Sequence, residues 1–541
     1  MLLSDNSLNS LNSLNSLNTI SCPGLFYQTA AKDGVLSRLR TPGGIVTSQQ
    51  FNFIASLAEE FGNGCVYITN RANLQLRKIN NLIPADILDK LQKIGIASNI
   101  PEVDHLRNIM GSPTAGIDPY EVIDAIPLIR QLDNYISNRL DLAPLSPKFS
   151  VCFDGGGLLS VSDRPNDVIF SPIIIDGFVY FCVKLYLGDS FIDLGIILKP
   201  HESVDFFAAI ANVYLQYLSV DIEPVKANRK SRQPRLRDIF QYLGLGKFIR
   251  EVENFLGFSL QEFETAKTPL SQTGLQGHRM PRKKSFGKVF EGVKDNYLDN
   301  YRHIGVYPQK QLSLSYIGVV IPLGKLESWQ VQELTHIAQT YGSGIIRLTP
   351  WQNLILSDIP HQYINHVKSQ LVKIKLHWSQ DNIYSGLVTC VGNTGCSSSY
   401  TDTQNHAHLL AEYLDKNIPL DQPVKIHFTG CSKSCAQHGK SDITLLGVSY
   451  DDGVIKQQNY HIYIGNDIEN DIENDTNNYV IDESVQFGTQ LYKYVPFTEI
   501  LPLLKTMLQI YMTKRTNAQQ SFIEFVNQYQ RHDLQTIFNK I

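Results

Sequence analysis

An internal duplication constrains the fold of this 541-residue chain more than any other feature. Residues 39–79, LRTPGGIVTSQQFNFIASLAEEFGNGCVYITNRANLQLRKI, align without a gap with residues 319–359, so that Pro42 matches Pro322. The other shared turn residues are Gly62 and Gly342, Gly64 and Gly344, Thr69 and Thr349, and Asn73 and Asn353. A repeat of this length predicts two similar halves packed about a pseudo-twofold axis.

Each copy has the pattern of a strand, a helix and a second strand. In the first copy, GVLSRLRT reads as a strand that ends at Pro42-Gly43-Gly44. Ser48 precedes an apolar periodic segment that reads as a helix ending at Gly62. The run CVYIT that follows is typical of a strand.

The two copies differ in their polar residues. The first copy carries Arg38, Arg40, Arg71, Gln75 and Arg77. The matching positions hold Gly318, Val320, Trp351, Ile355 and Ser357. Because the arginine fork suits bidentate binding of carboxylates, the first copy is predicted to hold an anion and the second to be structural. The alternative is that these arginines are solvated residues at strand edges.

Four of the eight cysteines form two close pairs in Gly/Ser-rich loops, each after a β-like run. They are Cys390 and Cys396, with five residues between them, and Cys431 and Cys435, with three residues between them. Thiolates on such loops favour one inorganic site, either an iron–sulfur cluster or zinc, and the five-residue spacing fits a zinc knuckle poorly. Two disulfides are the other alternative, but the chain has no evident signal peptide, which favours a reducing compartment.

The composition is that of an ordinary soluble protein. The chain is 43% hydrophobic and 18% charged, with a formal net charge of −4, which gives no general affinity for nucleic acid. A run of about 18 apolar residues, as a membrane span requires, does not occur in the sequence. We therefore expect a cytoplasmic protein that binds neither nucleic acid nor membranes.

The cysteine pattern, C-x5-C followed by G-C-x3-C, resembles the cluster signature of the nitrite/sulfite reductase superfamily. HIGVYPQKQLSLSYIGVVIPLG in the second half is also similar to the nitrite reductases, and the resemblance covers about residues 21–530. NTGCSSSYTDT and GCSKSCAQHGKSDITLLGV resemble one branch more closely, the precorrin-3B synthases. In particular, Ser432 stands where nitrite reductases have a proline.

The resemblance implies an α+β fold in which two ferredoxin-like half-domains combine with two αβ domains. The expected division is an N-terminal extension (1–20), half-domain 1 (21–98), αβ domain 1 (99–261), a linker (262–300), half-domain 2 (301–380), αβ domain 2 with the cluster (381–505) and a C-terminal helix (506–541). The SLN repeat of the extension and an acidic, Asn-rich segment at Asn466–Asn478 lack core-forming residues, so both are expected to be dispensable.

The resemblance also implies cofactors. In the reductases the four cysteines hold a [4Fe–4S] cluster, and the last thiolate bridges to the iron of a siroheme. The precorrin-3B synthase branch has a mononuclear non-haem iron in addition to its cluster. His427 and His438 flank the second cysteine pair and are weak candidates for ligands of that iron, since a lone histidine is more often structural.

Site residues follow by the same resemblance. The candidates for catalysis are Arg38, Arg107 and Lys148. The candidates for binding a tetrapyrrole or its carboxylates are Arg40, Arg71, Asn73, Gln75 and Arg77. One departure is Pro147, which stands beside Lys148 where the family has an arginine and therefore removes one cationic contact. The basic run from Lys226 to Gly244 is a further candidate for anion binding.

The function expected from these features is that of a precorrin-3B synthase-like monooxygenase. Such an enzyme hydroxylates precorrin-3A with O2 and forms a lactone, using electrons from an NADH-linked reductase or a ferredoxin. The alternative is a ferredoxin-dependent nitrite or sulfite reductase with siroheme. A third class is a tetrapyrrole-binding or electron-transfer protein without turnover. A visible spectrum separates the first two, because siroheme has strong Soret and red bands.

Overall fold

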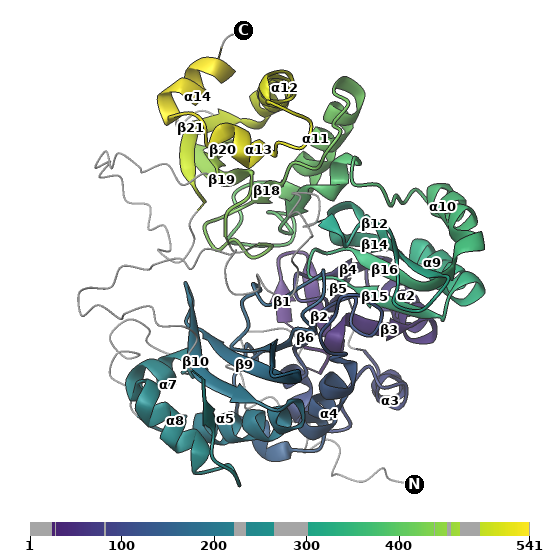
Figure 1. Cartoon of the computed structure of the whole chain (residues 1–541). Coiled ribbons are helices and arrows are strands. Elements are labelled where there is room, and N and C mark those ends of the chain that lie inside the picture. The colour runs from purple at the N-terminus through teal and green to yellow at the C-terminus, as the bar shows by residue number, and fades with distance from the viewer. Residues whose placement is uncertain are drawn as a thin grey trace.

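The computed structural model describes residues 24–26, 29–80, 83–220, 234–263, 301–437, 439–451, 456–465 and 487–539. These residues form four β-sheets. Figure 1 shows two sheets in the middle of the molecule, one sheet with its helices below them and one above them near the C-terminus. The central pair therefore connects the two outer domains.

The two central sheets exchange strands. The first has the order β1 (Thr29–Ala31), β2 (Gly34–Leu39), β5 (Leu74–Ile79), β4 (Cys65–Ile68), β14 (Lys325–Glu327). The second has the order β12 (Gly305–Pro308), β13 (Leu314–Val319), β16 (Leu354–Pro360), β15 (Ile345–Leu348), β3 (Ile45–Thr47). The last strand of each sheet comes from the other copy and pairs in antiparallel fashion. Neither half-domain sheet is complete alone.

Equivalent hydrogen bonds fix the exchange on both sides. The helices α2 (Ser48–Phe61) and α9 (Ser328–Tyr341) directly follow the exchanged strands. The Ser48 amide donates to the Gly344 carbonyl at 2.8 Å, and the Ser328 amide donates to the Gly64 carbonyl at 2.9 Å. The pairing of the same atoms at the same sequence offset confirms the predicted pseudo-twofold arrangement.

The local sequence explains where α2 begins and ends. The Thr47 hydroxyl accepts from the Gln50 amide, and the Gln50 side chain accepts from the Thr47 amide, which forms a capping box. Phe51, Ile54 and Ala58 recur at helical spacing, and all three are buried on one face. The helix therefore presents an apolar face to the other copy.

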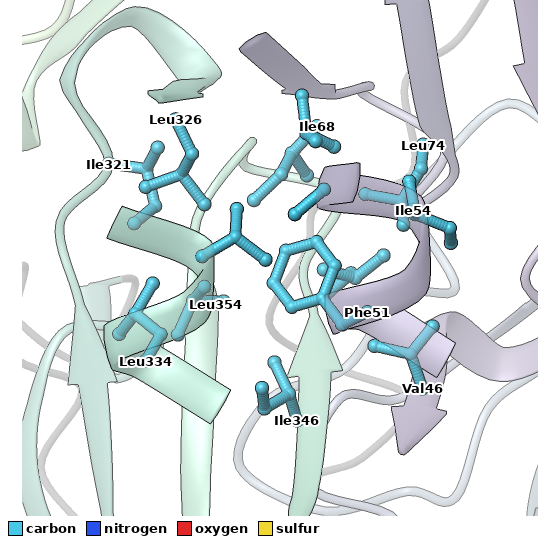
Figure 2. Close-up of a cluster of buried hydrophobic side chains, with 14 of the residues drawn as sticks. Val46, Phe51, Ile54, Ile68, Leu74, Ile321, Leu326, Leu334, Ile346 and Leu354 are labelled. Atoms are coloured by element: carbon cyan, nitrogen blue, oxygen red, sulfur yellow. The ribbon is translucent and has the colours of Figure 1, made fainter. Parts of the chain in front are cut away.

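The main core lies between the two copies. Figure 2 shows side chains from both halves pointing toward one another, with Phe51 of α2 near the middle. Phe51, Ile54 and Leu334 of α9 are fully buried in this cluster. Because the two halves share one core, we expect them to unfold as a single unit.

Replacing Phe51 by alanine should lower the free energy of unfolding by about 3–5 kcal/mol, because a fully buried ring leaves a cavity. Chemical denaturation of the purified protein measures this loss. Phe178→Ala is the matched control, since this ring is 69% exposed and its loss should change the free energy by less than about 0.5 kcal/mol. Equal effects of the two substitutions would contradict a shared core at Phe51.

The two outer sheets repeat one topology. The lower sheet has the order β11 (Gln261–Glu262), β10 (Phe191–Leu198), β9 (Phe178–Tyr186), β8 (Val168–Ile175), β7 (Val151–Phe153), β6 (Ile109–Gly111). The upper sheet has the order β17 (Leu387–Thr389), β18 (Ile426–Thr429), β19 (Ile443–Asp451), β20 (Lys456–Ile464), β21 (Thr489–Pro496). In each, the first three strands in chain order are parallel and the next two antiparallel. The structural duplication thus extends beyond the aligned segments.

Helices cover the sheets in both halves. The half-domains also contain α3 (Ala85–Lys93) and α10 (Ile364–Lys373). The lower core includes α4 (Ile126–Ser137), α5 (Ser203–Tyr217), α7 (Leu236–Leu243) and α8 (Leu245–Glu253). The upper core includes α11 (Thr403–Asn417), α12 (Phe497–Lys514), α13 (Phe522–Val526) and α14 (Arg531–Phe538). Each outer domain therefore has its own core.

The C-terminus differs from the sequence expectation. Instead of one helix over 506–541, α12 ends at Lys514, and α13 and α14 follow as short helices. The Ser521 hydroxyl caps α13 by accepting from the Glu524 amide, which starts a new helix where one continuous helix was expected.

Several expectations fall on residues outside the described ranges. These are the extension 1–20, most of the expected linker (264–300) and the acidic segment 466–478. Within the part of the chain that the structure describes, no helix is both long and apolar enough to cross a membrane.

Candidate cluster and anion-binding site

The two cysteine loops leave neighbouring strands at the same edge of the upper sheet. Cys390 directly follows β17, and Cys431 comes two residues after β18, which pairs in parallel with β17. Parallel neighbours bring their carboxyl ends together, so the loops meet. Their contact is direct, because the Gly430 amide lies 3.3 Å from the Cys390 sulfur and donates to it.

Small residues allow the loops to approach closely. A Cβ at Gly430 would lie 1.7 Å from the Ser399 hydroxyl oxygen, so only glycine fits between the two loops. Thr403, the first residue of α11, has its hydroxyl 3.5 Å from the Cys390 sulfur. A tight backbone around several thiols, with amide and hydroxyl donors, is a suitable environment for a cluster.

The four thiols act on one another electrostatically. Burial, together with the charges of Cys431, Cys390 and Cys396, raises the pKa of Cys435 to about 11. Burial is also the main cause of the raised pKa of Cys431. Among the described residues, no three His, Cys, Asp or Glu side chains are close enough to hold a single metal ion. Thiols that act on one another electrostatically fit a cluster, whose metal charge stabilises the thiolates.

The first half-domain contacts both cysteine loops. Asn70 donates its side-chain amide to the Cys435 and Ala436 carbonyls at 3.0 and 3.1 Å. Arg77 of β5 donates to the Gly395 carbonyl at 3.0 Å, one residue before Cys396. In Figure 1 the loops beneath β18 reach toward β4 and β5. Two loops of the upper domain are thus positioned by the turn and strand that carry the predicted arginines.

Arg77 is itself fixed by an ion pair. Its guanidinium is 4% exposed and makes a bidentate pair with Asp33, at 2.7 and 3.0 Å. A Cβ at Gly395 would lie 2.6 Å from the Arg77 Nη2, so this glycine makes room for the fork. Arg77 therefore supports a cysteine loop, which is not the tetrapyrrole-binding role expected for it.

A group of cations lies next to this region. Arg38 of β2 is opposite Gln75 of β5 and donates to its side-chain oxygen at 3.4 Å. Arg71 donates to the Asn166 side-chain oxygen at 2.7 Å. Burial lowers the pKa of Arg71; Asp167 opposes that shift, and the charges of Arg235 and Arg38 contribute to it. Three guanidinium groups are thus close enough to interact, which favours binding of an anion among them.

Arg235 extends this group from the lower domain. It stands at the start of α7 and donates to Asp167 at 2.9 and 3.2 Å. It also donates to the Lys148 carbonyl at 3.4 Å, while the Lys148 side chain is exposed. Arg235 therefore lies next to the backbone of Lys148. The basic run before α7 contributes Arg235 to the group of cations.

Arg107 lies elsewhere than expected. Its guanidinium is buried and makes a bidentate pair with Asp133 at 2.7 and 3.1 Å. It also donates to the Asp104 carboxylate and to the carbonyls of Gly95 and Ile96. These bonds engage all five N–H groups of the fork inside the protein, so that in this structure Arg107 ties the end of half-domain 1 to αβ domain 1.

Asn73 is buried in the turn between β4 and β5, and Arg40 is buried directly after β2. The Asn73 side-chain oxygen accepts from the Thr41 amide at 2.9 Å. Asn353 repeats this contact with the Ile321 amide at 2.8 Å in the second copy. Because the copy without arginines keeps the contact, Asn73 has a structural role that both copies share. Arg40 is 3% exposed.

Of the two candidate iron ligands beside the cysteines, the structure describes only His427. His427 lies fully buried within β18, and His438 lies outside the described residues. The sequence reasoning missed Asn70, Asp33 and Asn166, whose partners are more than forty residues away in the chain. The sequence offered one indication for Asn70. It precedes Arg71, and the matching position in the second copy holds Pro350, which has no side-chain amide to donate.

Family comparisons identify the class and then the family. The nitrite/sulfite reductase ferredoxin-like half domain matches residues 27–93 and 307–374. The nitrite and sulphite reductase 4Fe-4S domain matches residues 102–260 and 381–527. The fold and the four-thiol site are thus those of an iron–sulfur oxidoreductase. The chain belongs to the nitrite and sulfite reductase family, and the expected duplicated α+β fold and [4Fe–4S] cluster are confirmed.

Similar proteins cover most of the chain. The ferredoxin–nitrite reductase of Leptolyngbya laminosa is 30% identical over 500 residues, which is 90% of this chain and 88% of the relative. The chloroplastic ferredoxin–nitrite reductase of Zea mays is 29% identical over 440 residues, 78% of this chain and 71% of the relative. The solved structure of the Mycobacterium tuberculosis NirA protein has a TM-score of 0.70 and 20% identity, covering 92% of this chain and 84% of that one. The last likeness supports the fold.

These relatives correct the expected function. The interpretation as a precorrin-3B synthase-like monooxygenase is wrong, because the similarity to ferredoxin–nitrite reductases covers 90% of the chain. Ser432 and Pro147 are single-residue differences and carry less weight than this extent of similarity. The expectations of precorrin-3A, O2 and a mononuclear iron depended on that interpretation and are withdrawn with it.

Cys431→Ser should sharply lower iron and acid-labile sulfide per chain, because one of the four thiolates is lost. Metal and sulfide analysis of the purified protein measures this. Cys182→Ala is the matched control: this buried thiol lies on β9 in the lower domain, so the cluster content should stay unchanged. Full cluster retention in the Cys431→Ser protein would refute the ligand assignment.

Arg77→Ala should also lower the cluster content, because it releases the Gly395 carbonyl and leaves Asp33 as a buried carboxylate without its partner. Arg77→Lys should restore part of it, since a single ammonium cannot reproduce the fork. Iron per chain should therefore fall in the order wild type, lysine, alanine. Arg139→Ala removes a bidentate pair at the surface and should leave iron unchanged. An unchanged iron content in Arg77→Ala would rule out the supporting role.

Proposed function

We propose that this protein is a ferredoxin-dependent nitrite reductase that uses siroheme together with its [4Fe–4S] cluster. The observation that carries the proposal is the cationic group of Arg38, Arg71 and Arg235. Arg38 and Arg71 belong to half-domain 1, which also contacts the cysteine loops through Asn70 and Arg77. The names of the relatives support ferredoxin as the donor and nitrite as the substrate.

The residues present suit siroheme, whose peripheral carboxylates need cationic and amide partners. Arg38, Arg40 and Gln75 would hold those carboxylates from the β2 and β5 side of half-domain 1. Cys435, the last of the four thiols in the chain, would contact the siroheme as well as hold the cluster, as the family resemblance implies. Siroheme, when bound, supplies the iron at which a small nitrogen oxyanion is reduced.

The protein's part in the reaction is to attract, orient and charge-compensate the anion. Arg71 is desolvated, so its interaction with an anion is weakly screened by water. Lys148 is exposed beside the backbone contact of Arg235 and would add a mobile ammonium that attracts nitrite and supplies protons. Arg107 has no part in this step, because its donors are engaged with Asp133 and Asp104.

The direct experiment uses the purified holoprotein with reduced ferredoxin and nitrite. The visible spectrum should show Soret and red siroheme bands, and nitrite should be consumed with formation of ammonium. Sulfite, tested in parallel, distinguishes the two activities of the family. A protein with a full cluster but no siroheme bands and no nitrite turnover would disprove the proposal.

Arg71→Ala should weaken nitrite binding about 10- to 150-fold, since a charge-assisted hydrogen bond contributes about 1.5–3 kcal/mol. Titration of the siroheme spectrum with nitrite measures the affinity. Arg71→Lys should recover part of it, because the charge is kept but the fork is lost. Arg139→Ala, a surface variant, should bind nitrite as the wild type does. An Arg71→Ala protein with wild-type affinity would remove Arg71 from the anion site.

A further inference from the structure

One short segment of the lower domain contacts matching positions in both copies of the duplication. Arg71 in the first copy and Trp351 in the second occupy equivalent places. The Asn166 side-chain oxygen accepts from Arg71 Nη1 at 2.7 Å. The Arg164 guanidinium carbon lies over the Trp351 ring, 4.7 Å from its centroid. Residues 164 to 166 therefore connect the retained arginine of one copy to the aromatic residue that replaces it in the other.

Trp351 is in contact with two partners. The His303 ring stacks on it with a centroid distance of 4.5 Å and an interplanar angle of 12°. Arg164 and His303 therefore both lie against the indole ring. Trp351 also packs beside the buried Met110 and Ile169 of the lower sheet. The indole is thus a fixed platform for the Arg164 guanidinium.

The link from Arg164 to Asn166 is a local hydrogen bond. The Asn166 side-chain nitrogen donates to the Arg164 carbonyl at 3.2 Å and to the Met110 sulfur at 3.6 Å. Because Asn166 is 1% exposed and both donor contacts lie on one side, its amide oxygen is directed to Arg71. A displacement of the Arg164 backbone would turn this amide and release the Arg71 fork.

We propose that Trp351 and Arg164 are positioning residues for Arg71. The copy that lost its arginines supplies an aromatic platform, which fixes Arg164, orients the Asn166 amide and thereby aims Arg71. The role of Arg71 toward nitrite rests on the proposed function, whereas the positioning of its fork does not.

The alternative interpretation is that Trp351 has only a packing role in an apolar space. It lies among Ile117, Leu159 and Tyr316 as well as Met110, so its loss would destabilise the protein on that interpretation too. Arg164→Met separates the two interpretations, because it removes the guanidinium and keeps the apolar stem. Lys368→Met is the matched control, since Lys368 lies 5.4 Å from the Trp378 centroid in the same half-domain.

The first experiment labels arginines with phenylglyoxal and follows the Arg71 peptide by mass spectrometry, with the full-length protein as purified. In Arg164→Met the labelling rate of Arg71 should rise about three- to tenfold, because its fork loses a fixed partner. Lys368→Met should leave the rate unchanged. An unchanged rate in Arg164→Met overturns the proposal whether or not the protein reduces nitrite.

The second experiment is a double-mutant cycle on nitrite affinity, read from the siroheme spectrum. Arg164→Met should weaken binding about three- to tenfold in the wild-type background and have no further effect in the Arg71→Ala background. Trp351→Phe, which keeps a weaker aromatic face, should fall between wild type and Arg164→Met. Equal losses in both backgrounds overturn the proposal. If the wild type binds no nitrite, the proposed function fails, and the labelling result alone decides the positioning role.

Discussion

The reciprocal exchange of β3 and β14 is the constraint on which the rest of this structure depends. Each exchanged strand completes the sheet of the other copy, and the helix that follows it packs into a core shared by both. The exchange fixes the pseudo-twofold axis and therefore the relative places of Arg71 and Trp351. The exchange also places half-domain 1 in contact with both outer domains. Asn70 and Arg77 therefore contact the cysteine loops of the upper domain, and Arg71 contacts Asn166 of the lower domain.

The duplication is symmetric in backbone and asymmetric in chemistry. Ala72 and Gln352 share a left-handed conformation, with φ of 53° and 60°, and Lys78 and Asp358 do so with 54° and 63°. Such conformations are costly for residues with side chains and persist only where the surrounding fold requires them. The polar residues on this common frame have diverged, so that the first copy carries Arg71 and Arg77 where the second carries Trp351 and Ser357. The same backbone fold therefore carries different side chains in its two copies.

The features that sequence reasoning predicted are local in the chain. The helix between Ser48 and Gly62 and the paired spacing of the cysteines can each be read from a few neighbouring letters, and the repeat from two aligned segments, whereas the capping pair of Thr47 and Gln50 was not predicted. The exchange of strands cannot be read in this way, because nothing in IVT or KLE states which copy they join. Arg107 illustrates the same limit: an arginine suited to an anion is equally suited to Asp133, and only the tertiary contact decides between them. The function was misjudged because the residues around the cysteines and Pro147 were given more weight than similarity along the whole chain.

The exchanged strands also have a consequence for biosynthesis. β4 ends at Ile68, but its partner β14 begins at Lys325, so on the ribosome the growing chain carries an unpaired sheet edge and an uncovered apolar helix face for on the order of tens of seconds. An open edge of this kind is a template for pairing with another chain. The edge of the first half is therefore open to mispairing until β14 is synthesised, and both cysteine pairs follow β14 in the chain.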